Sequence, residues 1–149
     1  MSSKFKYQRG QSLIEVLAAL AVILLVIVAL IRATTISMKS GDFSKTQALA
    51  TSYAQEAIEW VRAERDKNWN EVADLATPDP GSKFCLNDLS WLDSNPCSDF
   101  ELAGRFKREV TLIAVGEEGN KVEVKVVLSW QDASGDHQSQ LTTYLSNWR

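Results

Sequence analysis

Residues 10–31 read GQSLIEVLAALAVILLVIVALI, and this stretch decides the fold of the chain. Every residue from Val16 to Ile31 is apolar, and the only interruption back to Leu13 is Glu15. As an α-helix, residues 13–31 would extend roughly 29 Å, about the thickness of the hydrocarbon core of a bilayer. The sequence therefore predicts one membrane-spanning helix close to the amino end.

The residues before this helix carry three cations and no acid: Lys4, Lys6 and Arg9. A short basic leader before one apolar helix predicts that the amino end stays in the cytoplasm and that the rest of the chain crosses the membrane. A secretory signal peptide is the main alternative, but it has a shorter apolar core followed by a cleavage site of small residues. The sequence RATT at residues 32–35 offers no such site. An uncleaved signal anchor is the other alternative.

Glu15 is the anomalous residue of the apolar stretch. A carboxylate inside a membrane helix costs roughly 2.5–3.5 kcal/mol on insertion scales. Either Glu15 lies near the helix start at headgroup depth and has no role, or it needs a partner. Its neighbours in the sequence favour the second interpretation.

Gly10 follows the basic leader and precedes the sequence QSLIEVL at residues 11–17. This arrangement resembles the type III signal of type IV prepilins, and the resemblance implies that a prepilin peptidase cuts between Gly10 and Gln11. Glu15 would then be the fifth mature residue, which in that family pairs with the new α-amine of a neighbouring subunit. Gln11 stands at the position that the family N-methylates, where the family usually has Phe or Met.

A second helix pattern covers residues 43–67. Its apolar or small positions recur at steps of three and four, which is typical of an amphipathic helix that packs on a sheet. We expect a kink or flexible point at residues 40–42, where Gly41 lies between Ser and Asp. The positions of the stripe are Phe43, Ala50, Ala54, Ala57, Ile58 and Val61.

The resemblance extends beyond the leader. Residues 50–65, ATSYAQEAIEWVRAER, look like the helix of minor prepilins of the pilus modification (PilV-like) group and of related secretion pseudopilins. Residues 142–149, TTYLSNWR, look like the end of PilV-like minor prepilins. The similarity touches about half of the chain.

Cys85 and Cys97 lie in the part of the chain that is expected outside the cytoplasm. Two thiols twelve positions apart in a small exported domain indicate a disulfide, and two buried thiols are the alternative. In the chain-entropy model such a loop closure stabilises by roughly 3 kcal/mol. A metal site is disfavoured, because the chain has no CxxC pattern and His137 is its one histidine.

Residues 68–99 are rich in aspartate and poor in regular patterns. The sequence TPDPG at residues 77–81 must break any helix. The resemblance raises calcium, because some pseudopilins bind it, but no DxDxDG-type loop is present and a solvated acidic loop is the simpler interpretation. We expect Trp69 and Trp91 to cover a small core.

The last third of the chain has the alternation of β-strands. Apolar residues occupy every second position of residues 122–130, and a similar pattern covers residues 106–112. Residues 116–120 form a hairpin loop between them, and residues 138–145 form a third strand. The sequence therefore predicts a three-stranded antiparallel sheet.

Together these patterns predict a type IV pilin-like α+β fold, in which a long N-terminal helix packs on a small antiparallel sheet. The expected parts are a cleaved leader (1–10), a membrane and assembly helix (11–31), its amphipathic continuation (32–67) and a globular head (68–149). Loss of the leader takes the formal charge from −3 to about −6, which argues against a nucleic-acid-binding surface.

We interpret the chain as a minor pilin or pseudopilin, a structural subunit that is not an enzyme and needs no cofactor. It would be stored in the inner membrane with its N-terminus inside and then join an extracytoplasmic filament. Its partners would be other pilin or pseudopilin subunits, prepilin peptidase, the inner-membrane assembly platform and, before assembly, membrane lipid. The alternatives are a type II secretion pseudopilin, a DNA-uptake pilus component that contacts DNA, and an uncleaved membrane-anchored binding domain.

Overall fold

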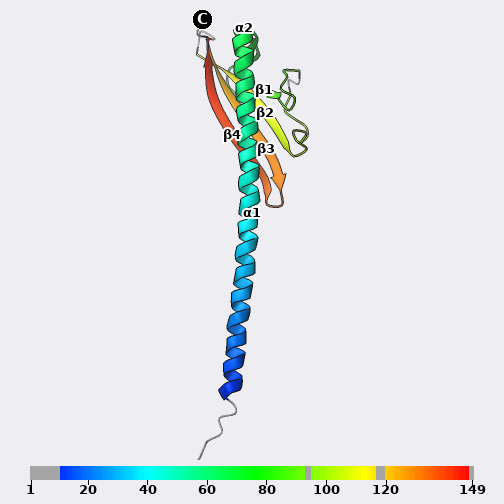
Figure 1. The fold of residues 1–149 in the computed structure, drawn as a ribbon. Coiled ribbons are helices and arrows are strands. Elements are labelled where there is room, and N and C mark those ends of the chain that lie inside the picture. The colour runs from blue at the N-terminus through cyan, green and yellow to red at the C-terminus, as the bar shows by residue number, and fades with distance from the viewer. Residues whose placement is uncertain (1–10, 93–94, 117–119, 148–149) are drawn as a thin grey trace, which may run out of the picture. The chain divides into compact units, whose positions relative to one another are not determined.

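The structure is a computed structural model, and it describes residues 11–92, 95–116 and 120–147, without the side chains of residues 11 and 12. The chain divides into two compact units, residues 1–44 and 45–149. The elements in chain order (Figure 1) are α1 (Gln11–Lys67), α2 (Trp69–Leu75), β1 (Ser82–Cys85), β2 (Phe106–Val115), β3 (Lys121–Asp132) and β4 (Gly135–Ser146). The expected α+β class is confirmed: a long N-terminal helix is joined to a small antiparallel sheet.

α1 is helical from Gln11 to Lys67, including residues 40–42, where the sequence predicts a kink or flexible point. A single glycine costs a helix up to about 1 kcal/mol, which the neighbouring turns can tolerate. Ser44 Oγ donates a hydrogen bond to Ser40 O at 2.8 Å, the i to i−4 bond that a serine makes inside a helix. The division between the two units follows Ser44.

The head contains an antiparallel sheet with the strand order β1-β2-β3-β4. β2 and β3 pair from Phe106 opposite Trp130 to Val115 opposite Lys121. β3 and β4 pair over twelve positions without a bulge, from Lys121 opposite Ser146 to Asp132 opposite Gly135. The hairpin loop expected at residues 116–120 includes residues 117–119, which lie outside the described residues.

The expectation of three strands is wrong, because β1 adds a fourth at the edge beside β2. β1 is only four residues long, and its alternation, with Phe84 buried between Lys83 and Cys85, is too short to stand out in the sequence. α2 is a second element that the sequence patterns do not predict. Asn68 caps it by accepting a hydrogen bond from Asn70 N at 3.2 Å, and it ends before the TPDPG turn.

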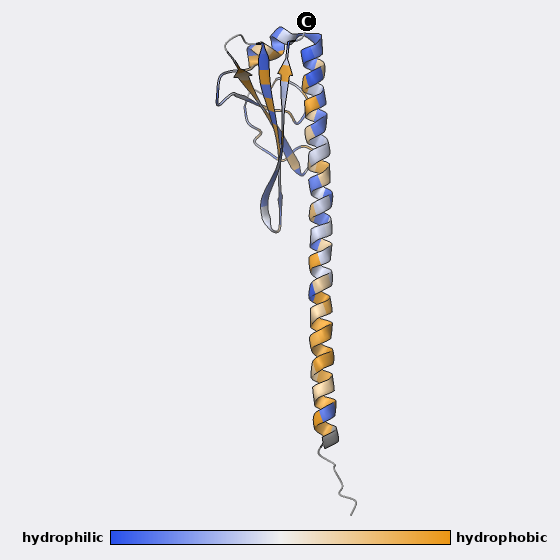
Figure 2. Ribbon diagram, turned by 90° about the vertical axis from the view of Figure 1, so that its left-hand side faces the viewer, coloured by the Kyte–Doolittle hydropathy of each residue, from blue (hydrophilic) through white to orange (hydrophobic). Residues whose placement is uncertain are grey.

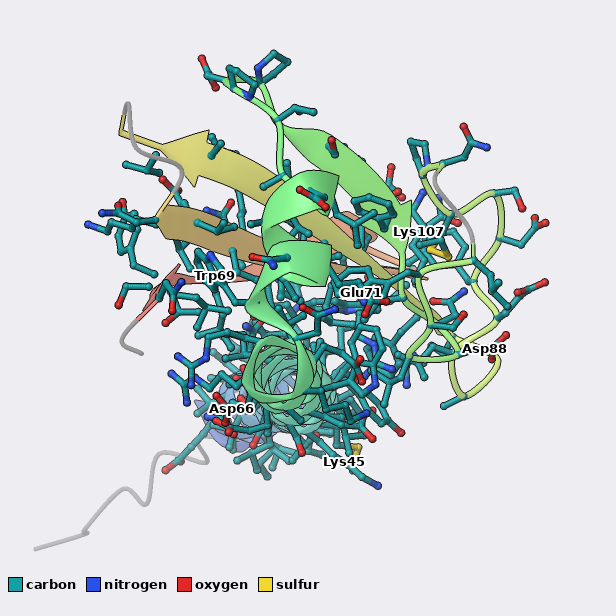
Figure 3. All side chains as sticks on the ribbon, turned by 90° about the horizontal axis from the view of Figure 1, so that it is seen from above. Lys45, Asp66, Trp69, Glu71, Asp88 and Lys107 are labelled. Carbon is teal, nitrogen blue, oxygen red and sulfur yellow. A yellow bond between two sulfur atoms is a disulfide. The ribbon has the colours of Figure 1, made fainter. Side chains whose placement is uncertain are left out.

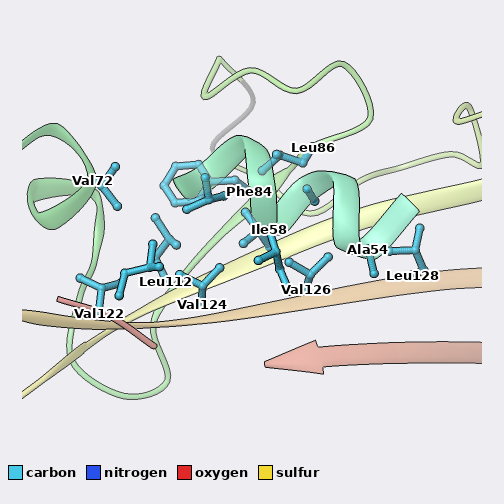
Figure 4. Close-up of a cluster of buried hydrophobic side chains, with 14 of the residues drawn as sticks. Ala54, Ile58, Val72, Phe84, Leu86, Leu112, Val122, Val124, Val126 and Leu128 are labelled. Atoms are coloured by element: carbon cyan, nitrogen blue, oxygen red, sulfur yellow. The ribbon is translucent and has the colours of Figure 1, made fainter. Parts of the chain in front are cut away.

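One face of the sheet packs on α1 and α2 to form the core of the head, part of which Figure 4 shows in close-up. The helix contributes mainly small side chains to this core, and the strands contribute larger ones. Phe43, which its spacing places on the same stripe, is instead 41% exposed and belongs to the first unit. The core includes Ala50, Ala54, Ala57, Ile58, Val61, Val72, Phe84, Leu86, Phe106, Val110, Leu112, Val122, Val124, Val126, Leu128, Trp130 and Leu145.

Partly buried aromatic side chains pack against the edge of this core. Trp69 and Trp91 pack against it, as the sequence predicts. Trp91 lies 4.7 Å from Trp60 of α1 and 5.4 Å from Phe84 of β1, measured between ring centroids. Trp91 thereby links the helix, the first strand and the long loop that follows it.

Candidate functional site

The described part of the first unit is a helix with an apolar, exposed surface. The large apolar side chains from Leu13 to Ile31 are all exposed, and the orange part of α1 in Figure 2 shows how continuous this surface is. By length and composition α1 is the one described helix that is long and apolar enough to cross a membrane. A helix that is apolar all round needs lipid or other helices around it.

The residues that we expect to form a processing signal are Gly10, Gln11 and Glu15. Gly10 is outside the described residues, and Gln11 is the first residue of α1. Glu15 lies in the second turn and its side chain is exposed. Glu15 follows Gln11 by four positions, which corresponds to about 6 Å along the helix axis.

The apolar surface ends with polar groups that fit the end of a membrane segment. Arg32 is the first charged residue after Glu15, roughly 25 Å along the helix axis. Thr35 Oγ1 donates a hydrogen bond to Ile31 O at 2.9 Å, and Thr34 Oγ1 contacts Leu30 O at 3.1 Å and Ile31 O at 2.9 Å. These hydroxyl groups are satisfied by their own helix and tolerate an apolar surrounding.

In the head, a disulfide joins Cys85 at the end of β1 to Cys97 in the segment between β1 and β2, which we call the disulfide loop. Cys97 N donates a hydrogen bond to Glu109 Oε1 at 3.1 Å, and Lys83 Nζ lies 3.8 Å from the other carboxylate oxygen of Glu109. The loop is therefore held at Cys97 by a covalent bond and by a carboxylate of β2.

Arg108 of β2 is the main polar group inside the head, with a side chain that is only 1% exposed. Its Nη1 donates to Glu56 Oε2 at 2.6 Å and to Tyr53 O at 3.0 Å, both in α1. Its Nε donates to Leu86 O at 2.9 Å and its Nη2 to Asn87 O at 3.3 Å. One guanidinium group thus connects a strand, the amphipathic part of α1 and the start of the disulfide loop.

The sequence patterns described above do not identify Arg108 as a buried polar residue. The signal that could have found it is its position: it lies between Phe106 and Val110, at an inward-facing place in the alternation of β2. A charged residue on the buried face of a strand needs a partner. In the sequence, Glu56 stands out only as one of several polar residues of the helix.

The tip of the β3–β4 hairpin contains a smaller polar cluster. His137 Nε2 lies 2.9 Å from Asp132 Oδ1, and the imidazole stacks on buried Trp130 with ring centroids 5.5 Å apart. The hydrogen bond to His137, together with the bond from Ser134 N, lowers the pKa of Asp132 below its ordinary value. On the outer face of the sheet, a hydrogen bond to Glu123 raises the pKa of Tyr144.

The acidic segment does not form a cation cage in the part of the chain that is described. Asp74, Asp79, Asp88 and Asp99 do not converge on a common point, and Asp93 lies outside the described residues. Among the described residues, no group of three or more His, Cys, Asp or Glu side chains could hold a metal ion. Figure 3, a view from above, shows Asp88 in the loop that lies beside β1.

Comparison with known proteins bears on the amino-terminal segment. No curated protein and no solved structure matches the chain. Residues 5–31 match the model of the prokaryotic N-terminal methylation motif, a segment that contains Gly10, Gln11, Glu15 and the whole apolar stretch. Residues 5–31 of the chain therefore carry an N-terminal methylation motif of the type IV prepilin-like kind.

Proposed function

We propose that this protein is a minor pilin or pseudopilin, a subunit of a type IV pilus-type filament that is stored in a membrane and assembled through α1. The observation that carries the proposal is the apolar helix directly behind a prepilin-type signal, exposed from Leu13 to Ile31. The helix would lie in lipid before assembly and against the helices of other subunits in the filament. The resemblance of residues 50–65 and 142–149 to PilV-like proteins supports a minor rather than a major subunit.

Processing would occur between Gly10 and Gln11, and the new amine of Gln11 would be the group that is methylated. In the filament, the carboxylate of Glu15 would pair with the α-amine of a neighbouring subunit. The pairing suits a staggered neighbour because about 6 Å along the axis separates the two groups within one chain. Transfer from lipid to a helical bundle exchanges one apolar surrounding for another, so the pairing of two otherwise unpaired charges would supply specificity.

The first test is the mature amino terminus. The full chain is expressed with a tag at its carboxyl end, with and without a prepilin peptidase, and its terminal peptide is identified by mass spectrometry. We expect the chain to begin at Gln11 when the peptidase is present and at Met1 when it is absent. A chain that begins at Met1 in both cases would contradict the proposal and would leave a membrane-anchored domain.

The second test separates cleavage from assembly. Glu15→Gln removes the charge and keeps the shape, and its matched control is Glu59→Gln, which removes an exposed carboxylate of the same helix. We expect the Glu15 variant to be cleaved but lost from sheared filaments, while the Glu59 variant enters them normally. Equal incorporation of the two variants would refute the role of Glu15.

A further inference from the structure

Residues 33–41 of α1, ATTISMKSG, lie between the apolar stretch and the part of the helix that packs on the sheet, and they have no role in the function proposed above. We propose that these residues, the hinge segment, open and reform their helix in water, so that the head can change its direction relative to residues 13–31. The proposal needs residues 13–31 to lie in a membrane or a micelle, but it does not depend on cleavage or on filament assembly.

The hinge segment is exposed along its whole length, including Ile36 at 68% and Met38 at 71%. Further along α1, Ala50 and Ala54 are fully buried against the sheet. In the other direction, Arg32 ends the apolar stretch that lipid would surround. Most of the stability of a helix in a protein comes from the packing of its apolar face, so the hinge segment has to form its helix from its own residues.

Most residues of the hinge segment are poor helix formers. Three successive residues are β-branched and lose side-chain freedom in a helix, and two serines and a glycine follow. A short helix in water is marginal even when every residue favours the helix. The unfavourable residues are Thr34, Thr35, Ile36, Ser37, Ser40 and Gly41.

Hydroxyl side chains bind carbonyl oxygens of the helix at both ends of the hinge segment. Near its start, Thr35 Oγ1 donates a hydrogen bond to Ile31 O at 2.9 Å. Near its end, Ser44 Oγ donates to Ser40 O at 2.8 Å. Hydrogen bonds of this kind slightly destabilise a helix and often bend it, so both ends of the segment favour opening.

Packing does not require a glycine at position 41. A Cβ at Gly41 would meet no atom within 4 Å beyond its own helix backbone, and its conformation is helical. Gly81 differs, because a Cβ there would lie 2.9 Å from Leu112 O. What the glycine adds at position 41 is therefore the conformational freedom of its backbone.

Opening of the hinge segment leaves the core of the head intact. None of the buried core side chains lies in the segment, since the first of them in α1 is Ala50. The division between the two compact units of the chain follows shortly after, behind Ser44. For a subunit of the proposed kind, the hinge would let the head meet other heads while the apolar helix is still in lipid. This consequence alone rests on the proposed function.

The first experiment measures hydrogen exchange in the full chain in detergent micelles, resolved by peptide and corrected for the intrinsic rate of each amide. Local opening lets amides exchange without unfolding of the whole protein. We expect the amides of residues 33–41 to exchange about a hundredfold faster than those of residues 50–61, which pack on the sheet. Equal protection of these two parts of α1 would overturn the proposal.

Alanine variants connect the opening to the residues of the hinge segment. Gly41→Ala should slow the exchange of residues 33–41 about fivefold, the factor that corresponds to the difference in helix propensity. Ser40→Ala and Ser52→Ala form a matched pair of exposed serines in α1, inside and outside the segment. We expect the first to slow this exchange about twofold and the second to leave it unchanged. Unchanged exchange in Gly41→Ala, or equal effects of the two serine variants, would contradict the hinge.

The motion of the head is measured separately, by the time-resolved fluorescence anisotropy of tryptophan in micelles. All five tryptophans lie between residues 60 and 148, beyond the hinge segment. We expect part of the wild-type anisotropy to decay faster than the micelle tumbles, and a stiffened variant to lose most of this fast decay. The same decay in both proteins would refute the proposal. The stiffened variant combines Thr34→Ala, Thr35→Ala, Ser40→Ala and Gly41→Ala.

These measurements need neither a peptidase nor a filament. If exchange and anisotropy show no hinge while the chain is cleaved before Gln11 and enters filaments, the hinge is wrong and the proposed function stands. If the chain begins at Met1 with and without the peptidase, the proposed function is wrong, and the exchange and anisotropy results still decide the hinge.

Discussion

Replacing Arg108 by methionine tests whether the buried guanidinium holds the head together. Methionine keeps an unbranched side chain but removes every donor. The carbonyl oxygen of Asn87 loses its donor at the start of the disulfide loop, Leu86 O keeps only its bond from Leu89 N at 3.2 Å, and Glu56 loses its cation. Tyr53 O also loses a donor, but it belongs to a helical backbone.

The magnitude follows from the burial of each group. Removing one partner of a buried ion pair generally costs about 3–5 kcal/mol, and a buried carbonyl left without a donor costs about 1–3 kcal/mol. Here Glu56 is 52% exposed and can be rehydrated, which places the loss toward the lower end of that range. We expect Arg108→Met to lower the free energy of unfolding by about 3 kcal/mol.

Glu56→Gln is the matched comparison. It removes the anionic charge but leaves the guanidinium with its three carbonyl acceptors and an amide oxygen in place of the carboxylate. Because the lost charge lies at the surface, we expect a cost of about 1 kcal/mol or less. The two variants therefore differ in cost although they break the same ion pair.

The assay is urea unfolding of the full chain in detergent, followed by tryptophan fluorescence, since Trp130 is fully buried in the core. The m-value should be unchanged, which shows that the same surface is exposed on unfolding. If Arg108→Met is neutral, or if Glu56→Gln costs as much as Arg108→Met, the reasoning is refuted. The first outcome would mean that the carbonyl contacts contribute nothing, and the second that the ion pair alone matters.

The remaining predictions concern the disulfide, a glycine and the hairpin tip. Replacing both Cys85 and Cys97 by serine should destabilise the head by roughly 3 kcal/mol in urea unfolding, whereas unchanged stability would show that the noncovalent contacts of the loop suffice. Gly81→Ala should lower the free energy of unfolding by well over about 1 kcal/mol. A Cβ at this position would lie 2.9 Å from Leu112 O and 2.6 Å from the Ile113 side chain. Gly81 also has φ = +86°, a value that it shares with Gly116. Gly116→Ala has open space around it and isolates the backbone penalty, so equal costs would exclude the clash. The lowered pKa of Asp132 implies stability that is present above the ordinary aspartate pKa of about 4 and lost as the pH falls through the folded pKa. Asp132→Asn should therefore flatten the loss of stability below about pH 4, and an unchanged slope in acid unfolding would contradict this.

The parts of the fold that could be predicted from the sequence are those with a long, regular pattern. β2 and β3 alternate over many residues, and the stripe of Ala50, Ala54, Ala57 and Val61 repeats at helical spacing. Burial of one face requires these periods, so the order of the residues alone reveals them. The apolar stretch at residues 13–31 is recognisable because a helix with an apolar surrounding on every side needs apolar residues at nearly every position.

The parts that could not be predicted depend on contacts between distant residues. β1 is a strand because Ser82–Cys85 pairs with Leu112–Glu109, and nothing within four residues reveals such a partner. α2 is seven residues long, too short to show a period or to be stable without packing. The alternation of β2 marks the position of Arg108 as inward-facing, but its partners could not be predicted because they lie 21 to 55 residues away.

α1 has to satisfy two different surroundings along one helix, and this explains how its residues are distributed. From Leu13 to Ile31 large apolar side chains cover every side, as a helix in lipid or in a bundle of helices requires. From residue 45 onward the buried apolar side chains lie on one stripe, and most of them are small where the helix meets the sheet. The small residues of this stripe pack against the sheet, and the long side chain of Arg108 reaches from β2 to the carbonyl oxygen of Tyr53 in α1 at 3.0 Å. A larger residue at Ala54 or Ala57, both fully buried, would separate the helix from the strands and break the Arg108 contacts as a secondary effect. We therefore expect a larger residue in the small stripe and the loss of Arg108 to disturb the same contacts between α1 and β2.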